Sequence, residues 1–370
     1  MTAEPPRADP VDDGGLDRAD ALHDLGRFAQ AAALAGARLA QHPDDARALI
    51  LLARCRRSLG DLPGALACVD DALRVAPDDT YAWLVRVDTL VRLGRFAEAE
   101  EAAHRCIALS PHFWGGHHCL AVVLEQSRQR GRRHEAYLAA RRATELEPQA
   151  ASAHFMVGLL AHRLGDRATA RLAYETTLRL DPENSEAHNN LATLDMRRSW
   201  FSRAAWTRAA EGFVASAALD VEDRHARFNL EAMAWGIAAG GRWPALLGFV
   251  VSLVGRAPQS AGGGARAAAT VTGAVLLLAL WSGWALWQRG KLSPRLRRPL
   301  LLTARGCPPV VAMAVAVAVM AAYSVVVMAL PSLGAGVVGA LAVPLFWGLI
   351  LTYWISRAAL NRRSPDRRGR

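Results

Sequence analysis

Residues 80–111, TYAWLVRVDTLVRLGRFAEAEEAAHRCIALSP, decide the fold of this chain. Apolar residues recur every three or four positions on both sides of the central LGRF, which is the pattern of two amphipathic helices joined by a tight turn. Gly94 stands where the first helix must stop and reverse, Ala99 where two helices must approach closely, and Pro111 where the second helix must end. The segment therefore predicts one helical hairpin.

The same hairpin recurs along the chain with a fixed period. Three residue types each form a series with steps of 34, 34, 37 and 34 positions. The series are glycine at 26, 60, 94, 131 and 165, alanine at 31, 65, 99, 136 and 170, and proline at 43, 77, 111, 148 and 182. Such periodicity is typical of a solenoid, in which each unit buries its apolar face against the next. The longer step is a three-residue insertion around SRQRG, between the paired helices of the fourth unit.

These features resemble the tetratricopeptide repeat family over about residues 12–239. LDPENSEAHNNLATL (180–194) is the best single match, and Trp83 stands at the family's aromatic position in the first helix. The resemblance implies an all-α fold with a right-handed superhelical solenoid, and the apolar stretches described below predict that a transmembrane helical segment follows it. The expected parts are a disordered acidic arm at 1–19, an array of about six units at 20–221, a capping helix at 222–239, a membrane domain at 240–357 and a basic tail at 358–370.

The net charge of +10 is not spread along the chain. Residues after 231 include 15 basic residues and one acidic residue, whereas residues 21–231 are balanced. Arginine beside an apolar span is a topology signal rather than a phosphate-binding surface, so we expect no nucleic-acid partner. Lys291 is the only lysine, a bias that indicates a GC-rich bacterial genome. The five cysteines contain no CxxC pair and are interpreted as buried thiols in a reducing compartment.

Apolar stretches in the last third are long enough to cross a bilayer, which takes about 20 residues. We expect spans at about 234–255, 267–287, 308–330 and 334–356. The first is imperfect because it contains Arg242. The alternative is three spans preceded by an interfacial helix at 243–255.

The arginines predict the orientation of these spans. The connection at 288–307 has six basic residues and no acidic one, and the tail is basic as well, so both should be cytoplasmic. The N-terminus has no apolar run that could serve as a signal peptide. Four spans then place the repeats in the cytoplasm, and the chain is expected to be a multi-pass protein of the cytoplasmic (inner) membrane.

No pattern indicates catalysis, a cofactor or a metal ion. HExxH, GxSxG, phosphate-loop and dinucleotide motifs do not occur in the sequence. The histidines at 117, 154, 188 and 225 lie one repeat apart, so an intervening helix keeps them too far apart to share an ion. We expect no catalytic residue, no cofactor and no metal site, and therefore no enzyme.

The resemblance implies that the first helix of each hairpin lines a concave, partner-binding groove. By phase the candidate groove residues are Arg54, Arg57, Tyr81, Asp88, Arg92, His118, Phe155, His162, Arg163, Asn189 and Arg197. Two interpretations of the arginines stay open. Their donor forks suit a carboxylate or an acidic peptide, and they also suit the negative end of a helix dipole.

The leading hypothesis is a membrane-anchored scaffold or adaptor that binds a protein or peptide, an acidic one under the first interpretation, at the cytoplasmic face. A second hypothesis is a regulatory or accessory subunit of a membrane transport or envelope-assembly complex. A third is an intracellular sensor of peptides or small molecules that uses the groove. The lipid bilayer is the other expected partner, and small residues in the spans are compatible with a homo-oligomer.

Overall fold

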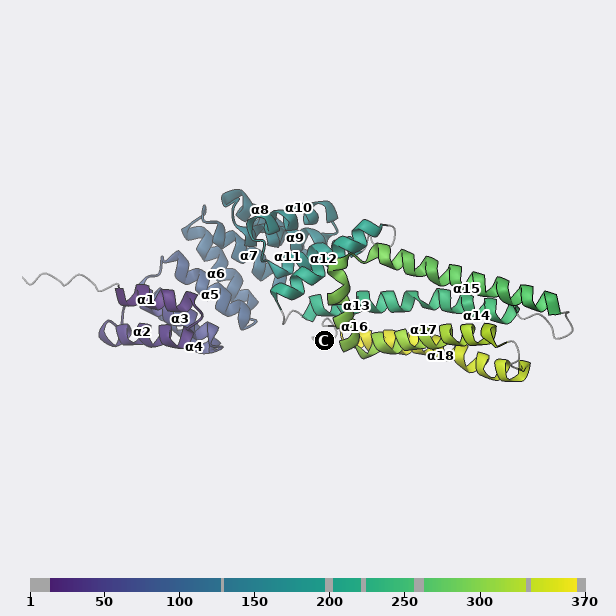
Figure 1. Cartoon of the computed structure of the whole chain (residues 1–370). Helices are drawn as coiled ribbons and strands as arrows, with labels where there is room; N and C mark the ends of the chain where they lie inside the picture. The colour runs from purple at the N-terminus through teal and green to yellow at the C-terminus, as the bar shows by residue number, and fades with distance from the viewer. Residues whose placement is uncertain are drawn as a thin grey trace, which may run out of the picture. The chain divides into compact units, whose positions relative to one another are not determined.

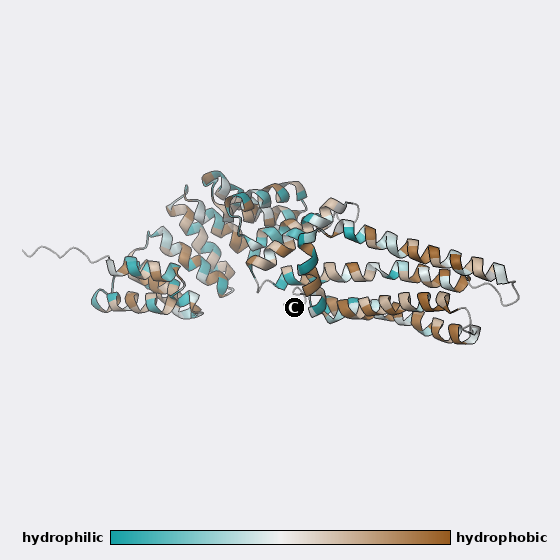
Figure 2. Ribbon diagram, in the orientation of Figure 1, coloured by the Kyte–Doolittle hydropathy of each residue, from teal (hydrophilic) through white to brown (hydrophobic). Residues whose placement is uncertain are grey.

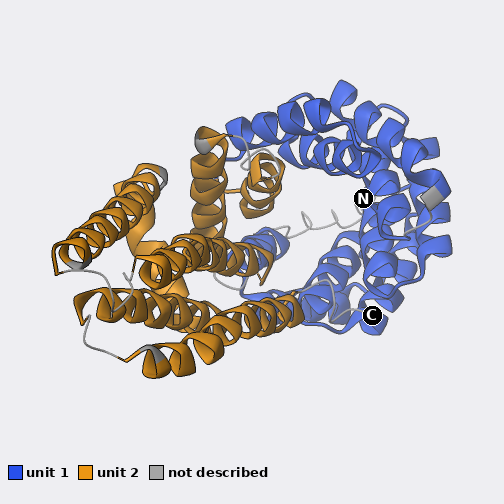
Figure 3. Cartoon of the chain, turned by 90° about the vertical axis from the view of Figure 1, so that its right-hand side faces the viewer, with its two compact units in different colours: residues 1–182 blue, residues 183–370 orange. Residues whose placement is uncertain are grey.

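The computed structural model describes residues 14–127, 130–196, 202–220, 224–255, 263–330 and 334–364. Within these ranges every regular element is a helix, which confirms the all-α prediction (Figure 1). The chain divides into two compact units, residues 1–182 and 183–370 (Figure 3).

The first unit is a row of antiparallel helical hairpins. Each odd-numbered helix pairs with the even-numbered helix that follows it. The helices are α1 (Gly14–Asp24), α2 (Phe28–Gln41), α3 (Ala46–Ser58), α4 (Leu62–Val75), α5 (Thr80–Arg92), α6 (Phe96–Leu109), α7 (Trp114–Gln126), α8 (Arg133–Leu146), α9 (Ala151–Leu164) and α10 (Arg167–Leu180).

The periodic glycines and alanines have the roles that their spacing predicts. The turn glycines Gly60, Gly94 and Gly165 have φ of +88°, +73° and +90°, a left-handed conformation that costs glycine little. The periodic alanines, all with no exposed surface, are Ala31, Ala65, Ala99, Ala136 and Ala170. A larger side chain at these positions would hold the paired helices apart.

Aspartate side chains cap the N-termini of several helices. After the proline turns, Asp45 accepts a hydrogen bond from the backbone N–H of Ala48, and Asp79 accepts one from that of Ala82. Such a side chain satisfies an N–H group that has no partner within the helix. These hairpins therefore begin with an acidic cap and turn at a glycine.

The inserted segment differs from the other turns. A short 3₁₀ helix, η1 (Arg130–Arg132), precedes α8 in place of the glycine turn. Arg132 donates to Glu100 at 2.7 Å and to Glu135 at 2.8 Å, which ties the segment to α6 and α8.

The prediction of a disordered arm at 1–19 is wrong at its C-terminal end. Residues from Gly14 onward form α1, because Leu16 and Ala19 are buried against the alanines of α2. Residues 1–13 lie outside the described part of the chain.

The second unit begins with one more hairpin and continues into long apolar helices. Its elements are α11 (Ser185–Met196), α12 (Arg203–Leu219), α13 (Arg224–Gly240), α14 (Arg242–Val254), α15 (Gly263–Lys291), α16 (Pro294–Gly306), α17 (Pro308–Ala329) and α18 (Ala335–Arg362). Figure 2 shows apolar residues concentrated along α14, α15, α17 and α18.

The capping region and the first expected span form one helical run. Gly241, between α13 and α14, keeps helical backbone angles, so the helix continues from Arg224 to Val254. Four helices in the described residues are long and apolar enough to cross a membrane: Arg224–Val254, Gly263–Gly290, Pro308–Ala329 and Gly336–Arg362.

The basic connection at 288–307 contains a helix that the sequence analysis did not anticipate. α16 is amphipathic, and its Leu296 and Leu300 are buried with Trp206 and Phe213 of α12 and Leu230 of α13. Its arginines lie on the other side, so the positive charge of this segment is carried on a packed helix.

Candidate partner-binding surface

The odd-numbered helices of the first unit form one continuous row. α3 packs on α1 and α5, and α7 packs on α5 and α9, in addition to the contacts within each hairpin. In a curved solenoid the helices on the inner side of the bend approach one another most closely. We call the surface of α1, α3, α5, α7 and α9 the inner face; the curvature of this unit is visible in Figure 3.

Two arginines of α3 connect three successive repeats. The Arg54 guanidinium donates to Asp20 of α1 at 2.9 Å and lies 5.8 Å from the ring centre of Tyr81 on α5. Arg57 forms an ion pair with Asp88 of α5 at 2.9 Å. Burial lowers the pKa of Arg57, although the Asp88 charge acts in the opposite direction. The side chains of both arginines are largely buried.

The remaining arginines of the inner face also have acidic partners. Arg163 of α9 pairs with Glu125 of α7, and Arg92 lies 3.7 Å from Asp88. Each of the four predicted arginines of this unit therefore lies beside an acidic residue, with Arg57 and Arg92 sharing Asp88. For three of the four, that residue is on the first helix of a neighbouring repeat. Neither the acidic-peptide interpretation nor the helix-dipole interpretation anticipated these pairs between repeats.

The predicted aromatic and histidine residues divide between packing and exposure. Tyr81 is 47% exposed and is a large apolar side chain open on this face. Phe155 packs against Tyr174 with 5.9 Å between ring centres, and His162 is half-buried. Burial lowers the pKa of His118 to about 4, so this imidazole is neutral near pH 7. It lies 5.6 Å from the Trp114 ring, and its Nδ1 has no hydrogen-bond partner among the described residues.

The last two predicted groove residues lie outside the first unit as it is described. Asn189 lies on α11 in the second unit, where its side-chain oxygen accepts a hydrogen bond of 3.0 Å from Asn229 of α13. Arg197 lies outside the described residues. The inner face of the first unit thus includes the predicted residues from Arg54 to Arg163.

Apart from the inner face, a polar cleft that was not predicted from the sequence lies where α4, α5 and α6 meet. This cleft has a volume of about 710 Å³. Arg86 stacks 5.6 Å from the Trp83 ring centre and pairs with Asp70 at 2.8 Å. Trp83 was recognised in the sequence, but the side chains around it come from three helices, and no spacing rule connects them.

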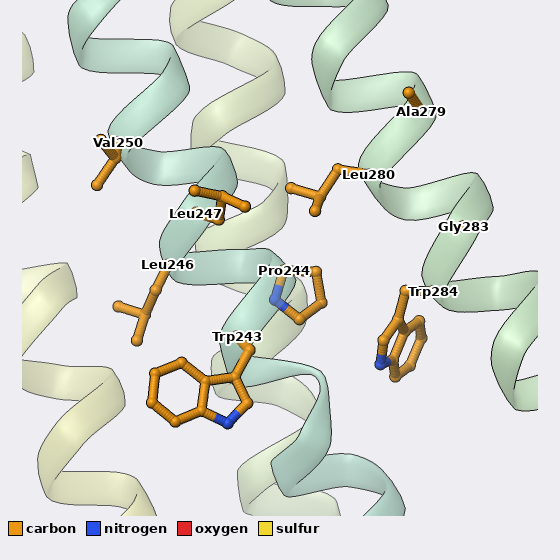
Figure 4. Close-up of a pocket in the computed structure, with 9 residues that line it drawn as sticks. All are labelled: Trp243, Pro244, Leu246, Leu247, Val250, Ala279, Leu280, Gly283 and Trp284. Atoms are coloured by element: carbon orange, nitrogen blue, oxygen red, sulfur yellow. The ribbon is translucent and has the colours of Figure 1, made fainter.

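The second unit has an apolar pocket between α14 and α15 (Figure 4). Its volume is about 720 Å³, and it is lined by Trp243, Pro244, Leu246, Leu247, Val250, Ala279, Leu280, Gly283 and Trp284. Another apolar pocket, of about 580 Å³, lies between α15 and α17.

Across the described ranges no three His, Cys, Asp or Glu side chains are placed to hold a metal ion. Burial raises the pKa of Cys106 to about 11 and that of Cys119 to about 12, so neither is a thiolate near neutral pH. The cleft between α4, α5 and α6 is lined by an aromatic ring and paired charges, whereas the two pockets of the second unit are apolar.

The first unit is a row of capped helical hairpins that turn at left-handed glycines, which makes this chain an all-α repeat protein. Two segments of the chain, residues 22–87 and 163–217, each match a family model described as Tetratricopeptide repeat. The chain carries tetratricopeptide repeats, as the resemblance implied. No curated protein matches it.

Several solved structures are similar to part of this chain. The Cut9–Hcn1 hetero-tetramer of APC/C matches with 17% identity and a TM-score of 0.51, over 57% of this chain and 41% of that chain. The thermophilic TPR protein TTC0263 of Thermus thermophilus matches with 23% identity and a TM-score of 0.43, over 49% of this chain and 95% of that one. YrrB, described as a TPR protein with an unusual peptide-binding site, matches with 19% identity and a TM-score of 0.37, over 52% and 95%. These likenesses concern the fold alone.

Proposed function

We propose that this protein is a membrane-anchored scaffold that binds a protein or peptide partner through its repeats. One observation carries the proposal: a single chain joins tetratricopeptide repeats to four helices that are long and apolar enough to cross a membrane. Tetratricopeptide repeats serve protein–protein interaction, and the apolar helices would hold that activity at a bilayer.

The inner face is the proposed docking surface. Tyr81 offers an exposed ring beside the Arg54 guanidinium, and aromatic and arginine side chains are enriched among the residues that contribute most to protein interfaces. Because the neighbouring arginines are already paired, an acidic partner would have to compete with Asp20, Asp88 and Glu125. We therefore propose that ring contacts at Tyr81 contribute more to affinity than charge does.

The proposed location is the cytoplasmic membrane, with the repeats on the cytoplasmic side. The support is the charge of the connections: α16 and the C-terminal tail are rich in arginine, and positive residues flanking apolar spans are retained in the cytoplasm. The repeats and this basic helix then lie on the same side of the bilayer. The proposed domain limits follow the sequence except at the start of the array, which begins with α1 at Gly14 and extends to residue 221; a cap at 222–239 and the membrane domain at 240–357 follow.

A photo-cross-linking amino acid placed at Tyr81 in the full-length protein tests the docking surface. The matched control is the same amino acid at Leu172, which is 66% exposed and lies on the even-numbered helix α10. We expect a discrete adduct from position 81 in membranes of the native cell and no equivalent adduct from position 172. Identical adducts at both positions, or no adduct at position 81, would reject the inner face as the docking surface.

A further inference from the structure

Arg242 is an unusual residue in the apolar part of the second unit. It lies at the junction of α13 and α14, within a helix that is otherwise apolar for more than one turn on either side. Asp366 is the only acidic residue in the sequence after Glu231, and Glu231 is paired with Arg363. The guanidinium therefore has no carboxylate partner among the described residues of this unit.

The surroundings of Arg242 are aromatic and positively charged. Its guanidinium lies 4.9 Å from the Trp243 ring centre and 4.4 Å from that of Tyr353, and it donates to the carbonyl oxygen of Ala239 at 2.8 Å. On α18 itself, Arg357 donates to the Tyr353 hydroxyl at 2.9 Å. Two arginines thus approach one tyrosine. The contacts with the two aromatic rings do not neutralise the charge of Arg242, so its guanidinium can still bind an anion.

Trp243 connects this arginine to the apolar pocket, because its ring lies 4.9 Å from the Arg242 guanidinium and also lines the pocket. Trp243 and Trp284 lie at one end of the pocket, and Val250 and Ala279 lie at the other (Figure 4). The indole N–H of Trp284 has no acceptor among the described residues. The pocket is open on one side, because Trp243 is 64% exposed and Leu247 is 53% exposed. One end of the pocket is therefore aromatic, with the Arg242 guanidinium 4.9 Å from the Trp243 ring, and the other end is aliphatic and extends along α14 and α15.

We propose that this pocket binds one anionic phospholipid. The lipid phosphate pairs with Arg242, and one acyl chain lies in the pocket between α14 and α15. From Trp243 to Val250 the pocket follows the helix for about 10 Å at 1.5 Å per residue, enough for the upper part of an acyl chain. The lipid phosphate and acyl chain together explain why an arginine without a carboxylate partner is placed near an apolar pocket. The phosphate supplies the missing negative charge in a medium where an unpaired charge is costly. This inference rests on the proposed membrane anchor.

Quenching of tryptophan fluorescence tests the site in the full-length protein. The protein is reconstituted in phosphatidylcholine vesicles in which about one lipid in five is phosphatidylglycerol, the anionic lipid. The bromine label is placed on the acyl chains of either the phosphatidylglycerol or an equal amount of the phosphatidylcholine. Since one favourable charge contact of this kind corresponds to about a fivefold preference, we expect brominated phosphatidylglycerol to quench at about one fifth of the concentration that brominated phosphatidylcholine requires.

Two variants and one control separate the charge from the pocket. Arg242→Gln should abolish the preference for the anionic lipid, whereas Arg305→Gln should keep it, because Arg305 is an exposed arginine of α16 outside the pocket. Gly283→Leu should also abolish it while retaining Arg242. A Cβ at Gly283 meets no atom within 4 Å, so the leucine enters the pocket without disturbing the helix.

The possible results are distinguishable. Equal quenching by the two lipids in the wild type, or a preference that persists in Arg242→Gln, would overturn the lipid site and leave the membrane anchor intact. Quenching by neither lipid would overturn the anchor itself, and the lipid site with it.

Discussion

Truncation of Leu90 tests the packing that makes the first unit one array. Leu90 is on α5 and has no exposed surface. It belongs to a hydrophobic cluster that extends from α3 to α10. Replacement of such a residue by alanine removes three buried carbon atoms and leaves a cavity, which costs about 2–5 kcal/mol. Since the side chain is completely enclosed by helices that cannot collapse independently, we expect Leu90→Ala to cost about 3 kcal/mol.

Hydrogen exchange of the whole protein, measured by mass spectrometry, shows which helices lose protection in Leu90→Ala. In a solenoid each repeat contacts only its neighbours, so the loss should be greatest in peptides from α3 to α7. A loss of about 3 kcal/mol corresponds to exchange about a hundredfold faster there. Peptides from α13 to α18 should not change.

Leu172→Ala is the matched control, because it makes the same substitution on a helix of the same unit. Leu172 is 66% exposed, and surface substitutions change stability by less than about 0.5 kcal/mol. Equal effects of the two variants, or a loss of protection spread evenly over the chain, would refute the argument that Leu90 stabilises its own repeats.

Three further predictions concern turns, charges and pH. Gly165→Ala should destabilise the protein by about 1–2 kcal/mol because φ is +90°, whereas Gly36→Ala, within α2 and in open space, should stabilise it by up to about 1 kcal/mol; thermal unfolding gives both signs. Asp88→Asn should cost about 1–2 kcal/mol, because it leaves the largely buried Arg57 without its carboxylate, and an unchanged melting temperature in low salt would contradict this. Burial raises the pKa of Asp45, but hydrogen bonds from the Arg38 side chain and a backbone N–H together lower this pKa by more than burial raises it. The net shift is therefore downward. A depressed pKa contributes stability that is present above the unfolded-state pKa and is lost as the pH falls through the folded-state pKa; the stability difference between wild type and Asp45→Asn should therefore shrink in acid, and a difference that is constant with pH would argue against it.

The hairpin array could be predicted because its determinants are local. A glycine at a turn, an alanine at a helix crossing and a proline after a helix each act within a few residues, and the 34-residue period repeats the same signal. Gly131 shows the limit of such signals. It continues the glycine series, but the inserted residues place it in a 3₁₀ helix with an ordinary φ.

The charges of the inner face could not be predicted in the same way. Arg54 and Arg57 are three residues apart on one helix, but Arg54 pairs with α1 and Arg57 with α5. The direction of each arginine side chain depends on the position of an acidic residue about 30 residues away and on the packing around the aliphatic part of the arginine. Sequence phase identified the face and could not reveal that its arginines were already paired.

The apolar helices show a similar division. Length and hydropathy were sufficient to predict four candidate spans, which the four apolar helices match in number. The burial of Leu296 and Leu300 could have been inferred from their spacing of four residues on α16, but the high arginine content of the segment obscured that pattern. The aromatic surroundings of Arg242 come from α14 and α18, which are far apart in the sequence.

Cysteine labelling in intact cells tests the central claim, a membrane-anchored array with its repeats inside, most directly. One cysteine is introduced in the segment 256–262 and, in a second variant, another at Leu172, and each is exposed to a maleimide that cannot cross membranes. The native cysteines Cys55, Cys68, Cys106 and Cys307 are buried, and burial raises the pKa of the partly buried Cys119 to about 12, so none of the five should react. The account predicts labelling at 256–262 in intact cells and labelling at 172 only after lysis. Labelling at 172 in intact cells, or protection of 256–262 until lysis, would contradict it.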